Sequence, residues 1–215
     1  MARWAGIWVI AALLAPLPAT ATTLDYDAFV GGAKVGGAEI VIEKAADTYQ
    51  IHGKAWAEGF FSWMTEWRSH FTAAGRFVGG LPIGEGYSLI ELAKDKVKEI
   101  SLANGEVTYV KNGKSKQTPA PASKLDFLTA LFLPTNGCDT SSDIHSGKDQ
   151  YSVRLKRAQS MSGADGANLR CDFEVRDQDN ERIEASVWLG VVNGVTVPVR
   201  LDLKGAVEGT LKLRA

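Results

Sequence analysis

Apolar and polar residues alternate along most of this chain, and this period of two restricts its fold more than any other feature. The clearest run is 195–204, in which every odd position is aliphatic and every even position is polar or proline. Residues 169–176 and 207–214 repeat the pattern. Because successive side chains of an extended chain point to opposite faces, each run predicts a strand with one dry face and one wet face.

Turn residues fall between these runs. Asn-Gly pairs stand at 104–105, 112–113 and 193–194, and Asn-Gly favours the positive φ angles of tight hairpins. We therefore expect antiparallel pairing. Weaker alternation predicts further strands near 24–30, 37–44, 48–58, 62–72, 84–92, 96–103, 106–111, 149–158 and 184–192.

One segment has helical spacing instead. Apolar residues of 124–133 lie three and four positions apart, Ser123 with Asp126 resembles a capping box, and Pro134 is a stop. The segment is apolar nearly all round, which predicts a buried helix. The simplest place for it is the open end of a curved sheet.

These features predict an all-β fold. About ten strands are too many for a flat sheet with a single dry face, so the sheet should curl. We expect one domain over residues 22–215, built as a curled antiparallel sheet, barrel-like or β-spiral, with one short helix near 124–133.

Residues 1–21 are typical of a cleavable signal peptide. Arg3 is followed by the apolar run 4–17, and Pro18 precedes the small residues Ala19-Thr20-Ala21. An uncleaved anchor is the alternative, but the run is short for a membrane helix, which needs roughly 20 residues. No other segment is suited to span a membrane as a helix. We therefore expect export to the periplasm.

The two cysteines of the chain, Cys138 and Cys171, predict a disulfide in an exported protein. Such a bond would close a loop of 34 residues and contribute on the order of 3–4 kcal/mol. Cys171 lies on the dry face of its strand, which favours an interior, structural bond. Two cysteines and three scattered histidines make no metal site, and the sequence predicts no cofactor.

Aromatic residues concentrate in one short stretch, and Trp63, Trp67 and Phe71 share a face of the strand predicted at 62–72. The cluster predicts either the lining of a cavity for an apolar ligand or an ordinary barrel core. The candidate ligand-binding residues are Trp56, Phe60, Phe61, Trp63, Trp67 and Phe71.

Two tryptophans are placed on the polar side of their strands by the same alternation. Trp56 and Trp188 would there mark a partner surface, unless a helix or a second turn of sheet covers them. His52, His70 and His145 are far apart in sequence, and no nucleophile or acid motif accompanies them. We therefore predict no catalytic residues.

Several short segments, in their order along the chain, resemble a family of exported bacterial envelope proteins, the domain of unknown function 3108 (DUF3108). The segments are 26–36, 57–61, 125–131, 138–139, 170–172, 187–189, 197–201 and 209–211. The resemblance covers nearly the whole chain after the predicted signal peptide. It implies a periplasmic all-β protein with a curled sheet, and it brings no catalytic residues. After Cys138, where the alphaproteobacterial branch of the family usually has an arginine-rich turn, this chain has Lys148.

The sequence favours a non-enzymatic periplasmic protein that binds or scaffolds within the cell envelope. We expect an apolar ligand, or a lipid, lipoprotein or peptidoglycan-associated partner. Lys and Arg total 24 against 25 for Asp and Glu, so no basic excess predicts nucleic-acid binding. The alternatives are an integral outer-membrane barrel and a hydrolase of envelope polymers. The hydrolase would use carboxylates among Glu58, Glu66, Asp126 and Asp139.

Overall fold

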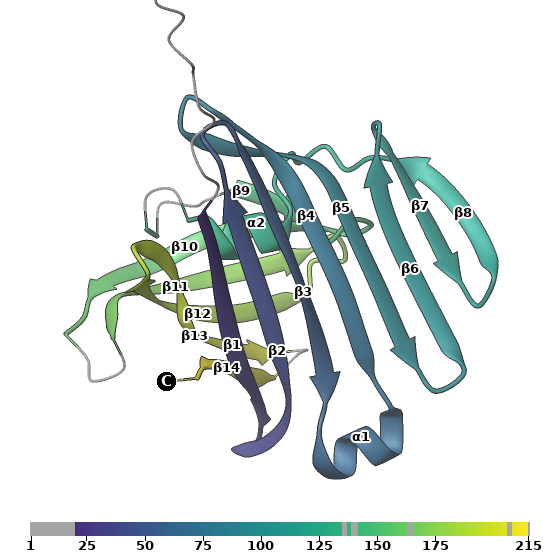
Figure 1. Ribbon diagram of the computed structural model, residues 1–215, viewed down its shortest axis with the longest axis horizontal. Helices are drawn as coiled ribbons and strands as arrows, with labels where there is room; N and C mark the ends of the chain where they lie inside the picture. The colour runs from purple at the N-terminus through teal and green to yellow at the C-terminus, as the bar shows by residue number, and fades with distance from the viewer. Residues whose placement is uncertain (1–19, 135–136, 139–141, 163–165, 206–207, 215) are drawn as a thin grey trace, which may run out of the picture.

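The computed structural model describes residues 20–134, 137–138, 142–162, 166–205 and 208–214, and Figure 1 shows them as one strongly curled sheet. Residues 1–19, with most of the predicted signal peptide, lie outside the described residues, and Thr20 and Ala21 begin the first strand. No helix of the described part of the chain is long and apolar enough to cross a membrane.

Over the residues that the structure describes, the fold consists of fourteen antiparallel strands and two short helices. The elements in chain order are β1 (Thr20–Val30), β2 (Ala33–Lys44), β3 (Thr48–Ala57), α1 (Gly59–Thr65), β4 (Arg68–Val78), β5 (Leu81–Ala93), β6 (Lys96–Ala103), β7 (Glu106–Lys111), β8 (Lys114–Pro119), α2 (Phe127–Phe132), β9 (Ser142–His145), β10 (Gln150–Ser160), β11 (Ala167–Asp177), β12 (Arg182–Val192), β13 (Val195–Gly205) and β14 (Gly209–Leu213). The all-β prediction is confirmed.

The strand order explains how the two halves of the chain meet. It runs β8-β7-β6-β5-β4-β3-β2-β1-β14-β13-β12-β11-β10-β9, so β1 pairs with both β2 and β14 in the middle of the sheet. Among the described strands, β8 and β9 are the two edges. The predicted curled sheet is therefore confirmed, and it is an open curl.

Alternation creates the inner face, as the sequence predicts. In β1, Thr22, Leu24 and Tyr26 are buried, whereas their neighbours Thr23 and Asp25 are exposed. The predicted Asn-Gly hairpins also form, because Asn and Gly have positive φ at 104–105, 112–113 and 193–194. Each strand has one apolar face. The sheet curls because curling removes this face of the strands from water.

The described residues 120–134, which follow the edge strand β8, cross the inside of the curl. The backbone N–H of Gly84 on β5 donates to the carbonyl of Lys124, and that of His145 on β9 donates to the carbonyl of Leu125. Gly84 allows this approach, since a Cβ built there would lie 2.9 Å from the Lys124 oxygen. The crossing segment thus ties together both flanks of the sheet.

The crossing segment ends in the predicted interior helix, which is shorter than expected. Helix α2 begins at Phe127, not at 124, because Asp126 is the N-cap. Leu128 and Phe132 are buried in the core that the sheet encloses, and Pro134 follows the helix as predicted.

Two predictions about local structure are wrong. The stretch predicted as a strand at 62–72 contains α1 up to Thr65, and β4 begins only at Arg68. Trp63, Trp67 and Phe71 are four residues apart, a spacing that fits a helix as well as a strand. The stretch 114–119, which the sequence does not predict as a strand, is the edge strand β8.

Candidate functional site

The curl encloses a cavity of about 910 Å³ that is partly open to solvent. Its volume lies in the range of small-molecule sites. The β1–β5 side contributes Ala28, Ile40, Ala55 and Phe71; the β10–β14 side contributes Val153, Phe173, Ala185 and Leu201; and α2 contributes Phe127, Leu128 and Leu131. The cavity thus lies between the two halves of the sheet, with α2 against it.

The lining is almost wholly apolar. None of the described lining residues carries a charge, and Thr65, Ser146 and Tyr151 supply its hydroxyl groups. A site built in this way lacks the convergent polar groups that orient a polar substrate. It suits a molecule whose surface is mainly hydrocarbon.

Helix α2 is held in place by a buried polar network at its start. The Asp126 carboxylate accepts from the Thr129 backbone N–H at 2.9 Å and from the Thr129 hydroxyl at 2.6 Å. The Thr129 hydroxyl is also hydrogen-bonded to the Tyr49 hydroxyl, 3.1 Å away on β3. Side-chain capping of this kind fixes where a helix begins, so the network positions α2 beside the cavity.

Burial perturbs the ionisable groups of this network. It raises the pKa of Asp126, which the two hydrogen bonds from Thr129 partly offset. It also raises the pKa of Tyr49 to about 12. His145 is buried nearby, with Nδ1 accepting from the Gly147 backbone N–H at 3.0 Å, and burial lowers its pKa. Asp126, Tyr49 and His145 are packed around the start of α2, and none of the three lines the cavity.

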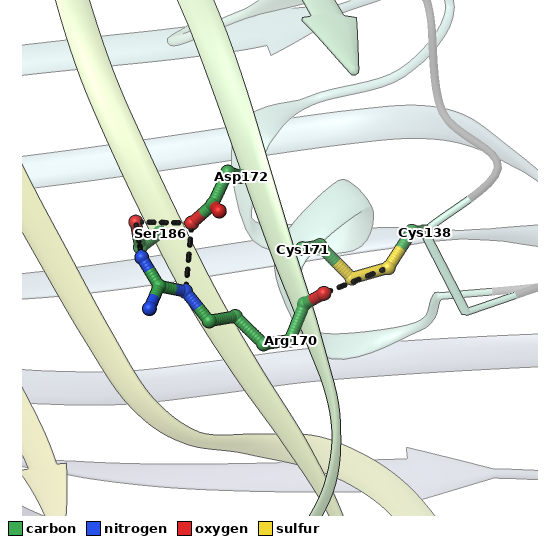
Figure 2. The surroundings of a disulfide bond; sticks show 5 residues. All are labelled: Cys138, Arg170, Cys171, Asp172 and Ser186. Carbon is green, nitrogen blue, oxygen red and sulfur yellow. Dashed lines mark hydrogen bonds and ion pairs between the residues drawn. A yellow bond between two sulfur atoms is a disulfide. The ribbon is translucent and has the colours of Figure 1, made fainter. Parts of the chain in front are cut away.

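The predicted disulfide is present at the other end of α2. Cys138 and Cys171 are bonded, with Cα atoms 5.4 Å apart, and both are buried with Val187 and Leu189. Figure 2 shows Cys171 turned toward Cys138, while the neighbouring Arg170 and Asp172 point to the opposite side of β11. Since Cys171 also lines the cavity, the bond anchors Cys138, which follows α2 in the chain, to the cavity wall.

The structure divides the six aromatic candidates into two groups. Trp56, Phe61, Trp67 and Phe71 line the cavity. Phe60 and Trp63 lie on the outer side of α1 and are 67% and 75% exposed. The difference arises because 59–65 is helical, so side chains one position apart in sequence diverge around the helix axis.

The two tryptophans expected on the polar side have charged neighbours. The indole Nε1 of Trp56 donates to Glu58 at 2.8 Å. Trp188 lies between the guanidinium groups of Arg170 and Arg200. The Cζ atom of each arginine is 4.7 Å from the centroid of the Trp188 ring. Both cations pack against the Trp188 ring from the strands on either side of β12, since Arg170 on β11 and Arg200 on β13 are its register partners.

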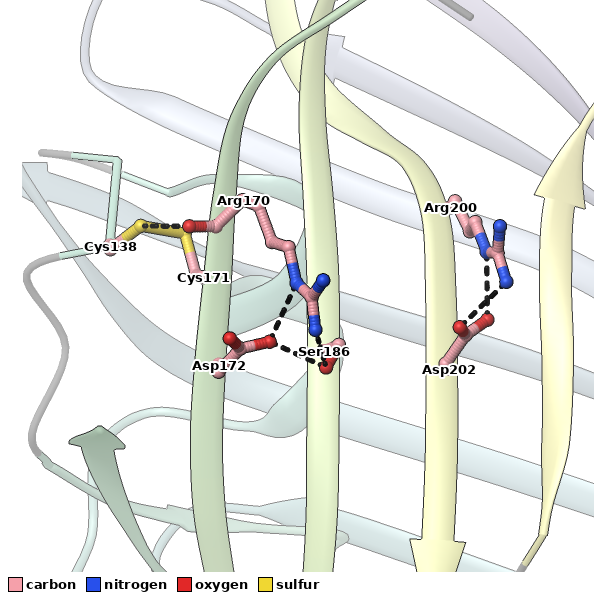
Figure 3. Close-up of polar contacts among 7 residues, drawn as sticks. All are labelled: Cys138, Arg170, Cys171, Asp172, Ser186, Arg200 and Asp202. Carbon is pink, nitrogen blue, oxygen red and sulfur yellow. Dashed lines mark hydrogen bonds and ion pairs between the residues drawn. A yellow bond between two sulfur atoms is a disulfide. The ribbon is translucent and has the colours of Figure 1, made fainter. Parts of the chain in front are cut away.

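Each arginine beside Trp188 is also held by a carboxylate, as Figure 3 shows. Arg170 Nε donates to Asp172 at 2.8 Å, and Arg200 makes a two-pronged contact with Asp202 at 2.9 and 2.8 Å. The outer face of β11–β13 is therefore a charge-paired surface in which the arginine charges are locally balanced.

The carboxylates considered for hydrolysis lie in different surroundings. Glu58 is paired with Lys34 at 3.0 Å, and hydrogen bonds from Trp56 and Lys34 hold its pKa below the usual value. Glu66 is exposed at the end of α1, Asp126 caps α2 inside the core, and Asp139 lies outside the described residues. Within the described ranges, no group of three or more metal-ligating side chains forms.

Sequence reasoning missed most of the cavity wall. Val153, Phe173, Ala185 and Leu201 belong to alternating runs and look like ordinary core positions. Alternation identifies the inner face of a strand, but it does not show whether opposite inner faces touch or stand apart. No match to this chain was found among protein-family models, curated proteins or solved structures.

Proposed function

We propose that this protein is a non-enzymatic periplasmic binder of an apolar molecule, such as an acyl chain of a lipid or lipoprotein of the cell envelope. The observation that carries the proposal is the cavity of about 910 Å³, whose described lining is uncharged and almost wholly apolar. Such a lining contributes binding free energy through burial of hydrocarbon, with little selectivity for polar groups. The periplasmic location and membership of the DUF3108 family stay predictions from the sequence.

A fluorescent fatty acid tests the proposal in solution. Dansyl-labelled undecanoic acid should bind the purified protein with enhanced emission, because its environment becomes dry. Mass spectrometry of protein extracted under native conditions should also find a co-purified apolar molecule.

Two substitutions fill the cavity from opposite walls. Ala55→Phe on β3 and Ala185→Phe on β12 both place a ring where a small side chain lines the cavity. Each should weaken probe binding at least about tenfold, a loss of about 1.4 kcal/mol in binding free energy. Ala158→Phe is the matched control, because Ala158 is exposed on β10 and is not among the cavity residues.

The proposal fails if the probe does not bind, or if both filled variants, shown to be folded by circular dichroism, bind it as tightly as the Ala158→Phe control does. In either case the apolar cavity is not a ligand site.

A further inference from the structure

Helix α1 carries an exposed apolar surface at one end of the molecule. Phe60, Trp63 and Met64 are 67%, 75% and 44% exposed, and the rings of Phe60 and Trp63 lie 5.9 Å apart. No residue of α1 is charged. Figure 1 shows α1 projecting from the ends of β3 and β4 beyond the edge of the sheet.

This surface continues into the cavity. Phe61 and Thr65 are on α1 and line the cavity, as do Trp67, directly after α1, and Ala93, at the adjoining end of β5. Arg68 at the start of β4 pairs with Leu92, so the end of β5 lies beside α1. One side of α1 therefore faces the cavity, and the other side faces outward.

The same edge of the sheet carries positive charge. The β5–β6 and β7–β8 turns lie along the edge from which α1 projects (Figure 1). Their exposed lysines are Lys94, Lys96, Lys111 and Lys114. Asp95 is the acidic residue within 94–96 and 111–114. The two turns are thus locally basic, although the exposed Glu66 lies at the end of α1 and the whole chain has a net charge of −1.

We propose that α1 and the turns 94–96 and 111–114 form a docking edge for an anionic phospholipid bilayer. Phe60, Trp63 and Met64 enter the boundary between headgroups and acyl chains, and the lysines contact the phosphates. In this orientation the α1 end of the cavity faces the membrane. The inference rests on the proposed function, since it names the lipid surface as the source or destination of the apolar ligand.

Vesicle binding tests the docking edge. The purified protein and its variants, all with the same N terminus, are sedimented with vesicles of phosphatidylglycerol mixed with an equal amount of phosphatidylcholine, and with vesicles of phosphatidylcholine alone. The wild-type protein should bind the anionic vesicles more tightly. Raising NaCl from about 0.1 M to about 1 M should weaken this binding, because the screening length falls from about 10 Å to about 3 Å.

Two double variants separate the apolar and the charged contributions. Phe60→Ser with Trp63→Ser should lower binding to both vesicles at least about tenfold, because the inserted apolar area is lost. Lys94→Gln with Lys96→Gln should lower binding to the anionic vesicles by about tenfold and leave the other vesicles unaffected.

The opposite end of the sheet provides the matched control. Val78 and Leu81 at the β4–β5 turn are 51% and 53% exposed, and neither lines the cavity. Val78→Ser with Leu81→Ser should leave vesicle binding unchanged. Equal binding by the α1 variant and this control would overturn the proposal.

The dansyl fatty acid distinguishes docking from ligand binding. The α1 variant should retain probe affinity in solution, because Phe60 and Trp63 do not line the cavity. Wild-type protein that binds the probe but no vesicle refutes docking and leaves the proposed function intact, whereas failure to bind the probe refutes the proposed function. If sedimentation instead shows a dimer that Phe60→Ser with Trp63→Ser dissociates, α1 contacts a second copy and the membrane proposal is wrong.

Discussion

Removing the Cys138–Cys171 bond should lower the free energy of unfolding by an amount that its position allows us to calculate. The two residues are 33 positions apart, so the bond closes a loop of 34 residues. Loop-closure entropy for that length corresponds to about 3–4 kcal/mol at room temperature. In a protein of this size each kcal/mol shifts the melting temperature by about 2–4 °C, which predicts a fall of about 6–16 °C.

The perturbation is the double substitution Cys138→Ala with Cys171→Ala. Alanine avoids a buried hydroxyl at two sites that are 4% and 1% exposed. Urea unfolding followed by circular dichroism gives the change in free energy. Dithiothreitol should destabilise the wild-type protein by a similar amount and leave the double variant unaffected, because the chain has no other cysteine.

The same variant should also weaken binding of the dansyl fatty acid while it remains folded. The bond anchors Cys138, which follows α2, to Cys171 on β11. Its loss therefore removes the covalent link between the chain after α2 and the wall of the cavity. A loss of less than about 1 kcal/mol in unfolding free energy would refute the loop-entropy reasoning. Unchanged probe affinity would refute the role of the bond in positioning the cavity wall.

Three further predictions concern the crossing segment and the residues of β5 and β9 that contact it. Thr129→Val removes the hydroxyl contact to Asp126 and should cost about 1–3 kcal/mol in urea unfolding; no measurable loss would contradict the capping role. Gly84→Ala forces a Cβ against the Lys124 carbonyl, 2.9 Å away, and should cost about 1–3 kcal/mol, with wild-type stability as the contrary result. Burial lowers the pKa of His145 from 6.5, so the folded state favours the neutral ring. The stability that this group contributes is present above pH 6.5 and is lost as the pH falls below that value. His145→Asn should reduce this loss, measured as the free energy of unfolding against pH. Identical pH profiles for the wild-type protein and the variant would show that His145 does not titrate on unfolding.

Alternation predicts most of the sheet because one buried face forces a period of two on each strand. It fails where both faces of a strand are wet. The polar strand β8 is exposed along most of its length, and lysine is common on such edges because it discourages pairing with other chains. The same residues therefore resemble a solvated loop when only the sequence is considered.

The candidate site was only partly predictable. Four of the six aromatic candidates line the cavity, but the distinction between Phe61, which lines the cavity, and Trp63, which faces outward, depends on α1. A seven-residue helix leaves little periodic pattern, and Gly59 with its φ of +59° is the local feature that breaks the strand. The cavity itself depends on how far the two halves of the sheet stand apart, which no local pattern encodes.

The pairing of β1 with β14 has a consequence for how the protein is made. Arg214 and Asp27, joined across this seam at 2.8 Å, are 187 positions apart. A polypeptide that is synthesised from its amino end presents β1 long before β14, the second neighbour of β1, exists. The central ladder is then completed only when the last strand arrives, and such distant pairing is slow. During that interval β1 has an unpaired edge, which is open to pairing with other chains.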